Sequence, residues 1–168
     1  MTTRPNQTLL LRWMKDSLRD AAWAPSLVFV IHVIALEVFN MYTRFPHFDV
    51  PMHFLGGVVM AFFFHCAFLN ASRLGVIGPY QALLHRLLVV TSTCAVAVFW
   101  EFAEFIIDQC FETQTQGGLE DTLGDLFFGV AGAVAFIVMV AVRARSPNPL
   151  FRWSPRRVKN TDAAFPGS

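Results

Sequence analysis

Charged residues are scarce in this sequence and unevenly placed. Only 15% of the 168 residues are Asp, Glu, Lys or Arg, whereas 55% are hydrophobic and 18 are Phe. A soluble domain of this length usually carries about 25% charged residues. The charges gather between long apolar runs, and the mean hydropathy is +0.48. The composition therefore predicts a one-domain integral membrane protein and excludes an ordinary soluble domain.

Three further absences narrow the class of protein. The three cysteines, Cys66, Cys94 and Cys110, are scattered and form no CxxC pair, which excludes a disulfide framework and a thiolate metal site. A net charge of +1 without a basic, aromatic-rich helix argues against a nucleic-acid partner. The N-terminal charges are not followed by a short apolar region with a cleavage site, so we expect the first apolar segment to be retained.

Four apolar segments are each long enough to cross the bilayer as a helix, at about residues 22–42, 50–70, 84–108 and 121–142. Residues 8–20 mix apolar and charged side chains in the pattern of a short interfacial helix. We therefore predict an all-α four-helix transmembrane bundle over residues 21–142. Residues 1–20 form a cytoplasmic or interfacial segment before it, and residues 143–168 form a basic cytoplasmic tail. In that tail we expect Phe151 and Trp153 to touch the interface and residues 160–168 to be disordered.

The basic residues predict the orientation of these segments. Twelve of the thirteen lie before the first segment, around the second connection or in the tail, and Arg44 is the exception. Lys and Arg accumulate on the cytoplasmic side of membrane proteins, so both termini should be cytoplasmic.

Three polar pairs stand at helical spacing near the ends of apolar segments: Asp49/His53, Glu101/Glu104 and Asp121/Asp125. Residues three or four apart share one face of a helix. The predicted orientation brings all six residues, together with Glu37, to one depth near the outer face. An ionisable group inside a bilayer costs roughly 3 kcal/mol or more, so their coincidence predicts a site.

Helix capping is the competing explanation for two of these residues. Asp49 precedes a Pro in the first helical turn and can be an N-cap, and Thr122-x-x-Asp125 resembles a capping box. For Asp49 and Asp121 the two explanations weigh equally. His53, Glu101 and Glu104 lie too deep to be caps. With Arg44 as the one basic residue nearby, an acidic cluster there must bind a metal, share protons or contact water.

Carboxylates with one imidazole and no thiolate favour a divalent metal such as Zn, Mn, Mg or Fe. The candidate ligands are Asp49, His53, Glu101, Glu104, Asp121 and Asp125. A catalytic version leaves one coordination position open for water, with Glu104 and His53 as acid/base groups. A bis-histidine haem is disfavoured because His32 and His65 lie at different depths. His32, His65 and His85 are better interpreted as core or interfacial histidines.

Residues 49–133 resemble a known family. The motifs are Asp49-Val-Pro-Met-His53-Phe-Leu-Gly56-Gly57, Trp100-Glu101-Phe-Ala-Glu104 and Asp121-Thr122-Leu-Gly-Asp125. Their order and spacing are similar to those of YjdF-like bacterial inner-membrane proteins and, more distantly, of VanZ-like proteins. The resemblance implies a multi-pass protein of the bacterial inner membrane with polar groups inside the membrane.

Three functions follow as hypotheses. The first is a small metal-dependent enzyme that acts on a lipid-linked or envelope substrate near the periplasmic face. The second is a non-catalytic cation or proton transport component, and the third is a structural subunit whose polar cluster fixes helix packing. The sequence shows no inverted repeat and no matching polar groups at the inner end, which favours a one-sided site. The lipid bilayer is the expected environment, and an oligomer is compatible with four short helices.

The predicted orientation can be tested directly. A reporter inserted at residue 115, between the third and fourth segments, should be active only outside the cytoplasm. Cytoplasmic activity at that position would reverse the topology and move the acidic cluster to the inner face.

Overall fold

The computed structural model describes residues 5–111, 113 and 116–145. The tail residues Phe151 and Trp153 and the segment 160–168 lie outside the described part. The chain divides into two units, Met1–Ile137 and Val138–Ser168. The first contains nearly all of the helical structure and the whole candidate site. Of the second, the structure describes the final helical turns up to Arg145.

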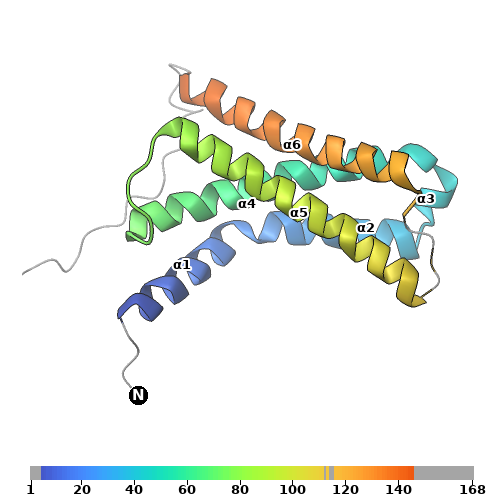
Figure 1. Cartoon of the computed structure of the whole chain (residues 1–168), viewed down its shortest axis with the longest axis horizontal. Helices are drawn as coiled ribbons and strands as arrows, with labels where there is room; N and C mark the ends of the chain where they lie inside the picture. The colour runs from blue at the N-terminus through green and yellow to red at the C-terminus, as the bar shows by residue number, and fades with distance from the viewer. Residues whose placement is uncertain (1–4, 112, 114–115, 146–168) are drawn as a thin grey trace, which may run out of the picture. The chain divides into compact units, whose positions relative to one another are not determined.

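Every regular element in the described residues is a helix, which confirms the all-α prediction. Their order along the chain is α1 (Pro5–Ala21), α2 (Trp23–Glu37), α3 (Met41–Arg44), the 3₁₀ turn η1 (Pro46–Phe48), α4 (Asp49–Leu74), α5 (Ala82–Phe111) and α6 (Leu119–Arg145) (Figure 1). By length and composition α4, α5 and α6 can each span a membrane, and the bent pair α1–α2 provides a fourth candidate span.

The helix predicted at residues 8–20 is present as α1, but it meets α2 at a bend of 56°. Pro25 explains the break, because its ring would collide with the carbonyl of Ala21, four residues earlier, in a continuous helix. α2 has only 15 residues and is about 22 Å long at 1.5 Å per residue. It is therefore too short by itself to cross about 30 Å of hydrocarbon.

The first apolar segment also ends earlier than the predicted residue 42. α2 stops at Glu37, and Asn40 adopts a left-handed conformation (φ 48°) before the short helix α3 begins. Asn tolerates this conformation better than most residues, so the chain turns at that point. Leu and Val residues of the segment are common in helices and gave no signal of this turn.

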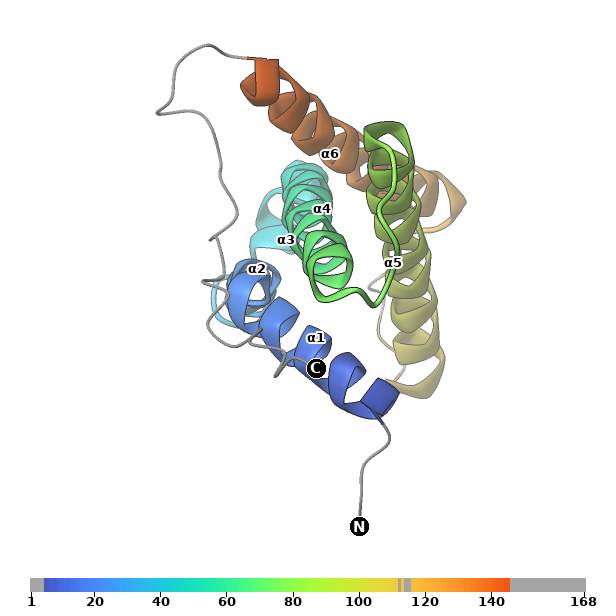
Figure 2. The ribbon, with the colours of Figure 1, turned by 90° about the vertical axis from the view of Figure 1, so that its left-hand side faces the viewer.

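α4 is the central helix of the first unit. Figure 2 shows it between α2, α5 and α6, and it also contacts α1. Glycines allow its close approach to α6. A Cβ atom on Gly57 would collide with the Gly129 carbonyl, and one on Gly132 would collide with the Phe54 carbonyl. Small residues that let backbones touch are typical of helix packing in membranes.

α1 is joined to the C-terminal half of α4 by side-chain contacts. Three side-chain interactions join them: Trp13 Nε1 donates to the Ala67 carbonyl at 2.8 Å, Asn70 Nδ2 donates to Asp20 Oδ2 at 3.3 Å, and Arg73 donates to Asp16 Oδ2 at 3.3 Å. Ser17 of α1 is buried. The N-terminal helix is therefore held by specific polar contacts and not by apolar contact alone.

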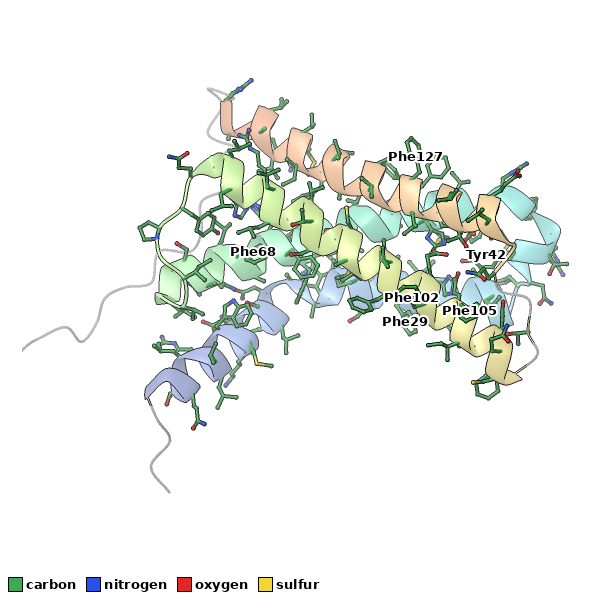
Figure 3. All side chains as sticks on the ribbon, in the orientation of Figure 1. Phe29, Tyr42, Phe68, Phe102, Phe105 and Phe127 are labelled. Atoms are coloured by element: carbon green, nitrogen blue, oxygen red, sulfur yellow. The ribbon has the colours of Figure 1, made fainter. Side chains whose placement is uncertain are left out.

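The outer surface of the helices is strongly apolar. Phe127 on α6 points away from the other helices, and Phe102 and Phe105 lie on the exposed side of α5 (Figure 3). Their exposed fractions are 65%, 57% and 49%. Large apolar side chains on this scale are typical of a surface that contacts lipid.

The contact between α4 and α6 can be tested with two neighbouring glycines. Gly57→Ala should destabilise the protein by about 1–3 kcal/mol, because the added methyl group would overlap backbone atoms of α6. Gly56→Ala is the matched control, since a Cβ there meets nothing within 4 Å. Thermal unfolding in mild detergent, followed by circular dichroism, measures both. Equal midpoints for the two variants would contradict the close approach.

Candidate metal centre

The site begins with two residues on the first turns of α4. Asp49 is the first residue of the helix and His53 follows one turn later, so their side chains share a face. His53 Nε2 lies 3.1 Å from Asp49 Oδ1. The prediction that Asp49 is the N-cap is wrong, because η1 leads directly into α4 and Phe48 occupies the cap position. Its carboxylate contacts His53 instead of the helix end.

Asp125 of α6 completes a cluster of three candidate ligand groups. Its side chain is 5% exposed and its Oδ1 lies 3.6 Å from the same His53 Nε2. One ligand atom from each of Asp49, His53 and Asp125 lies within 4.8 Å of the other two. Two ligands held about 2.1 Å from a tetrahedral zinc are roughly 3.4 Å apart. The spacing of the three groups therefore suits a common metal ion.

Glu101 on α5 lies next to this cluster and is 5% exposed. One of its carboxylate oxygens, Oε2, is buried without a hydrogen-bond partner in the described part of the protein. His53 and Asp49 are among the charged groups that act on it. A buried carboxylate oxygen without a partner is costly, and a ligand bound at the cluster would satisfy it.

Glu104 lies one turn from Glu101 and is held differently. Trp100 Nε1 donates a hydrogen bond of 2.7 Å to Glu104 Oε1. This contact orients the carboxylate without neutralising its charge. The six predicted residues therefore divide into three ligand groups in contact, two acidic neighbours on α5, and Asp121.

Asp121 lies in the first turn of α6 and contacts the connection before it. Its Oδ2 accepts the backbone N–H of Gly117 at 2.9 Å, and α6 begins at Leu119, two residues earlier than Asp121. The hydroxyl of Thr122 accepts a hydrogen bond from Gln116. The predicted Thr122–Asp125 capping box is therefore wrong, because the helix starts before it. For Asp121, the contact with Gly117 at the start of α6 favours the helix-capping explanation over a place in the site.

A second layer of side chains, which the sequence analysis did not identify, borders the cluster. Tyr42 of α3 and His32 Nδ1 of α2 are joined by a hydrogen bond of 2.5 Å, and the His32 ring packs edge-on against Trp100. Burial raises the pKa of the Tyr42 phenol, and nearby carboxylates such as Asp49 raise that pKa further. The phenol therefore stays protonated and is able to donate this hydrogen bond when His32 Nδ1 carries no proton.

Within the described residues, no Lys or Arg forms an ion pair with the acidic residues of the cluster. The ion pairs of Arg19 and Arg73 are with acidic residues of α1, and His53 is the partner of Asp49 and Asp125. Two or more carboxylates around one imidazole require a bound cation or shared protons. The charge of the cluster therefore gives a second reason, besides the spacing of its ligand atoms, to expect a bound cation.

The opposite end of α4 and α5 holds a polar chain that the sequence analysis treated as separate residues. His65 Nδ1 and His85 Nε2 are 2.8 Å apart, and the Tyr80 hydroxyl lies 3.0 Å from His85 Nδ1. The direct bond between the two rings leaves no space for a haem iron between them. Helical spacing could not predict the contact between these two histidines, because they are 20 residues apart on different helices.

Comparison with known proteins places the chain in a family. Residues 8–146 match a family model described as "Predicted membrane protein (DUF2238)". An uncharacterized protein of Thermotoga maritima is 32% identical over 127 residues, which cover 75% of this chain and 62% of the relative. The chain thus spans about three fifths of that relative's length. No solved structure gives a significant match. The chain belongs to the DUF2238 family of predicted membrane proteins.

Proposed function

We propose that this protein is a divalent-metal-dependent membrane enzyme whose metal is held by Asp49, His53 and Asp125. The buried, unpartnered Glu101 Oε2 beside these ligands is the observation on which the proposal chiefly rests. A structural ion cluster would leave such an oxygen paired, because an unpaired one lowers stability. In a site that binds a substrate or a metal-bound water, this oxygen can accept a hydrogen bond or a proton from it.

The metal would supply Lewis acidity and lower the pKa of a bound water. Three protein ligands leave a coordination position open, as in catalytic zinc sites. Glu101 then stands where a general base is needed and can accept a proton through its free oxygen. Glu104 adds negative charge from one turn away, and its hydrogen bond from Trp100 fixes its orientation. Zn, Mn, Mg and Fe all suit this donor set.

The placement in the membrane is part of the proposal. Because α2 is too short to cross alone, we take the bent pair α1–α2 as the first span, so that α4, α5 and α6 complete four crossings. The distribution of Lys and Arg then puts both termini in the cytoplasm of a bacterial inner-membrane protein, with the metal site near the periplasmic face. The resemblance of residues 49–133 to YjdF-like proteins agrees with this placement, and a lipid-linked or envelope substrate follows from it.

Metal retention tests the ligand assignment. Protein purified in mild detergent without chelator should carry near-stoichiometric metal by elemental mass spectrometry. His53→Ala and Asp125→Asn should lose it, because each removes one of three ligands. Asp121→Asn is the matched control and should keep it, since Asp121 contacts the loop. Glu101→Gln should also keep most of the metal, as a base that is not itself a ligand.

Weakly held Mg²⁺ can be lost on purification, so a calorimetric titration with Mg²⁺ and Mn²⁺ accompanies the analysis. Absence of metal and of binding in the wild type would overturn the proposal. If Asp125→Asn then lowers the unfolding temperature, the polar cluster stabilises helix packing through shared protons and not through a metal.

A transport role is the second candidate, and the His65–His85–Tyr80 chain favours it. Polar groups lie near both ends of α4, with His53 and His65 twelve residues, or roughly 18 Å, apart. A proton path would use both clusters, so reconstituted liposomes should show a proton flux that His85→Phe abolishes. An enzyme with a one-sided site should show no flux above that of protein-free liposomes.

A further inference from the structure

A cavity of about 230 Å³ adjoins the metal ligands on their membrane side. Three helices line it over similar lengths, from Pro25 to His32 on α2, from Met52 to Met60 on α4, and from Thr93 to Trp100 on α5. Seven residues of helix correspond to roughly 10 Å. The cavity therefore extends about two helical turns from the site towards the middle of the membrane.

The polar groups of this cavity stand at one end. His32, His53 and Trp100 mark its outer end, whereas Val28, Val59, Met60, Val96 and Ala97 form the remaining wall. Thr93 at the inner end does not change this, because its hydroxyl donates to the Val89 carbonyl at 2.9 Å. The cavity is thus amphiphilic along its length, with the polar end against the candidate metal centre.

Glycines create the space. Gly56, Gly57 and Gly129 all line the cavity, and a side chain on Gly56 would meet nothing within 4 Å. Water does not suit such a space, because a buried water needs two to four polar partners, and apolar cavities of about 150 Å³ stay dry and take up hydrocarbon. The apolar wall therefore selects a hydrocarbon occupant.

The size and access of the cavity point to a lipid chain. Sites that enclose a complete small ligand usually measure about 300–1,000 Å³, so this one suits only a segment of a longer molecule. Phe29 lines the cavity and is 53% exposed, and its ring packs edge-on against Trp100. The wall at Phe29 therefore separates the cavity from the lipid-facing side, where the rest of a chain would lie.

We propose that this cavity binds the first part of the hydrocarbon chain of a phosphate-bearing lipid, with the phosphate at the metal centre. The inference deepens the proposed function and rests on it for the headgroup. Without a cation, Asp49, Asp125 and Glu101 repel a phosphate. With a divalent ion, phosphate oxygens are preferred ligands of the open position. Chain binding depends on the cavity wall alone.

Photo-crosslinking separates these two parts. The probe is a single-chain lipid phosphate with a diazirine close to the headgroup, and an alcohol with the same chain serves as comparison. Cross-linked peptides should map to cavity residues on α4 and α5. Val96→Phe fills the cavity and should reduce labelling there at least fivefold. Val98→Phe is the matched control, since Val98 lies two residues away, is 39% exposed and does not line the cavity.

Chelation should reduce labelling by the phosphate probe and leave labelling by the alcohol unchanged. Cavity labelling that ignores chelation would support the chain site and overturn the phosphate assignment. Labelling confined to exposed residues, equal in both variants, would overturn the chain site even if the metal analysis succeeds. Val59→Phe fills the same space from α4 and replaces Val96→Phe if that variant does not fold.

Discussion

The close approach of α4 and α6 is the constraint on which the candidate site depends. Asp125 reaches His53 only because glycine backbones replace side chains between these helices, at Gly57, Gly129 and Gly132. In a bilayer, apolar side chains gain little by leaving lipid for protein, so close packing must supply the association. Two of these glycines, Gly57 and Gly129, also line the cavity next to the ligands. The glycine contacts between α4 and α6 thus bring the polar residues together and leave space for the apolar cavity beside them.

Burial of the acidic residues costs free energy that the close packing of α4 and α6 cannot offset alone. Burying a carboxylate costs several kcal/mol unless a cation, a proton or hydrogen bonds compensate. His53 compensates Asp49 and Asp125 in part, through a single nitrogen. Glu101 keeps a buried oxygen that no described group satisfies. A divalent ion removes the largest share of this cost in one step, because it can accept several carboxylates at once. Shared protons would neutralise the charge but would leave the spacing around His53 unexplained.

Much of the fold could be predicted from the sequence, since it follows from composition and helical spacing. Long apolar runs identified α4, α5 and α6 to within a few residues, and the i, i+4 pairs placed Asp49 with His53 correctly. The end of the first apolar segment was missed, because its residues remain apolar past the turn at Asn40. Helix starts were also misjudged at Asp49 and Thr122, where η1 and the loop at Gly117 begin the helices in ways that cap patterns do not encode.

Contacts between helices were the harder part. Spacing shows which residues share a face, but not which faces meet, so Asp121 could not be separated from Asp125 by sequence alone. Nor could the pairs His32–Tyr42 and His65–His85 be found, since each joins residues on different elements. Their detection requires the rotation of each helix about its axis, which depends on packing over its whole length.

The surroundings of the Asp49–His53–Asp125 cluster argue for a site that a substrate enters from within the membrane. At the loop end of the Asp49–His53–Asp125 cluster, Asp121 accepts the backbone N–H of Gly117 and Tyr42 is hydrogen-bonded to His32. Its membrane side instead meets a cavity with apolar walls that continues for two turns. A water-soluble substrate gains nothing from such walls, whereas a lipid keeps its chain in an apolar environment throughout. Hydrolytic chemistry at this position would then act on a headgroup drawn to the ligands from the bilayer, with Glu101 as the base beside it.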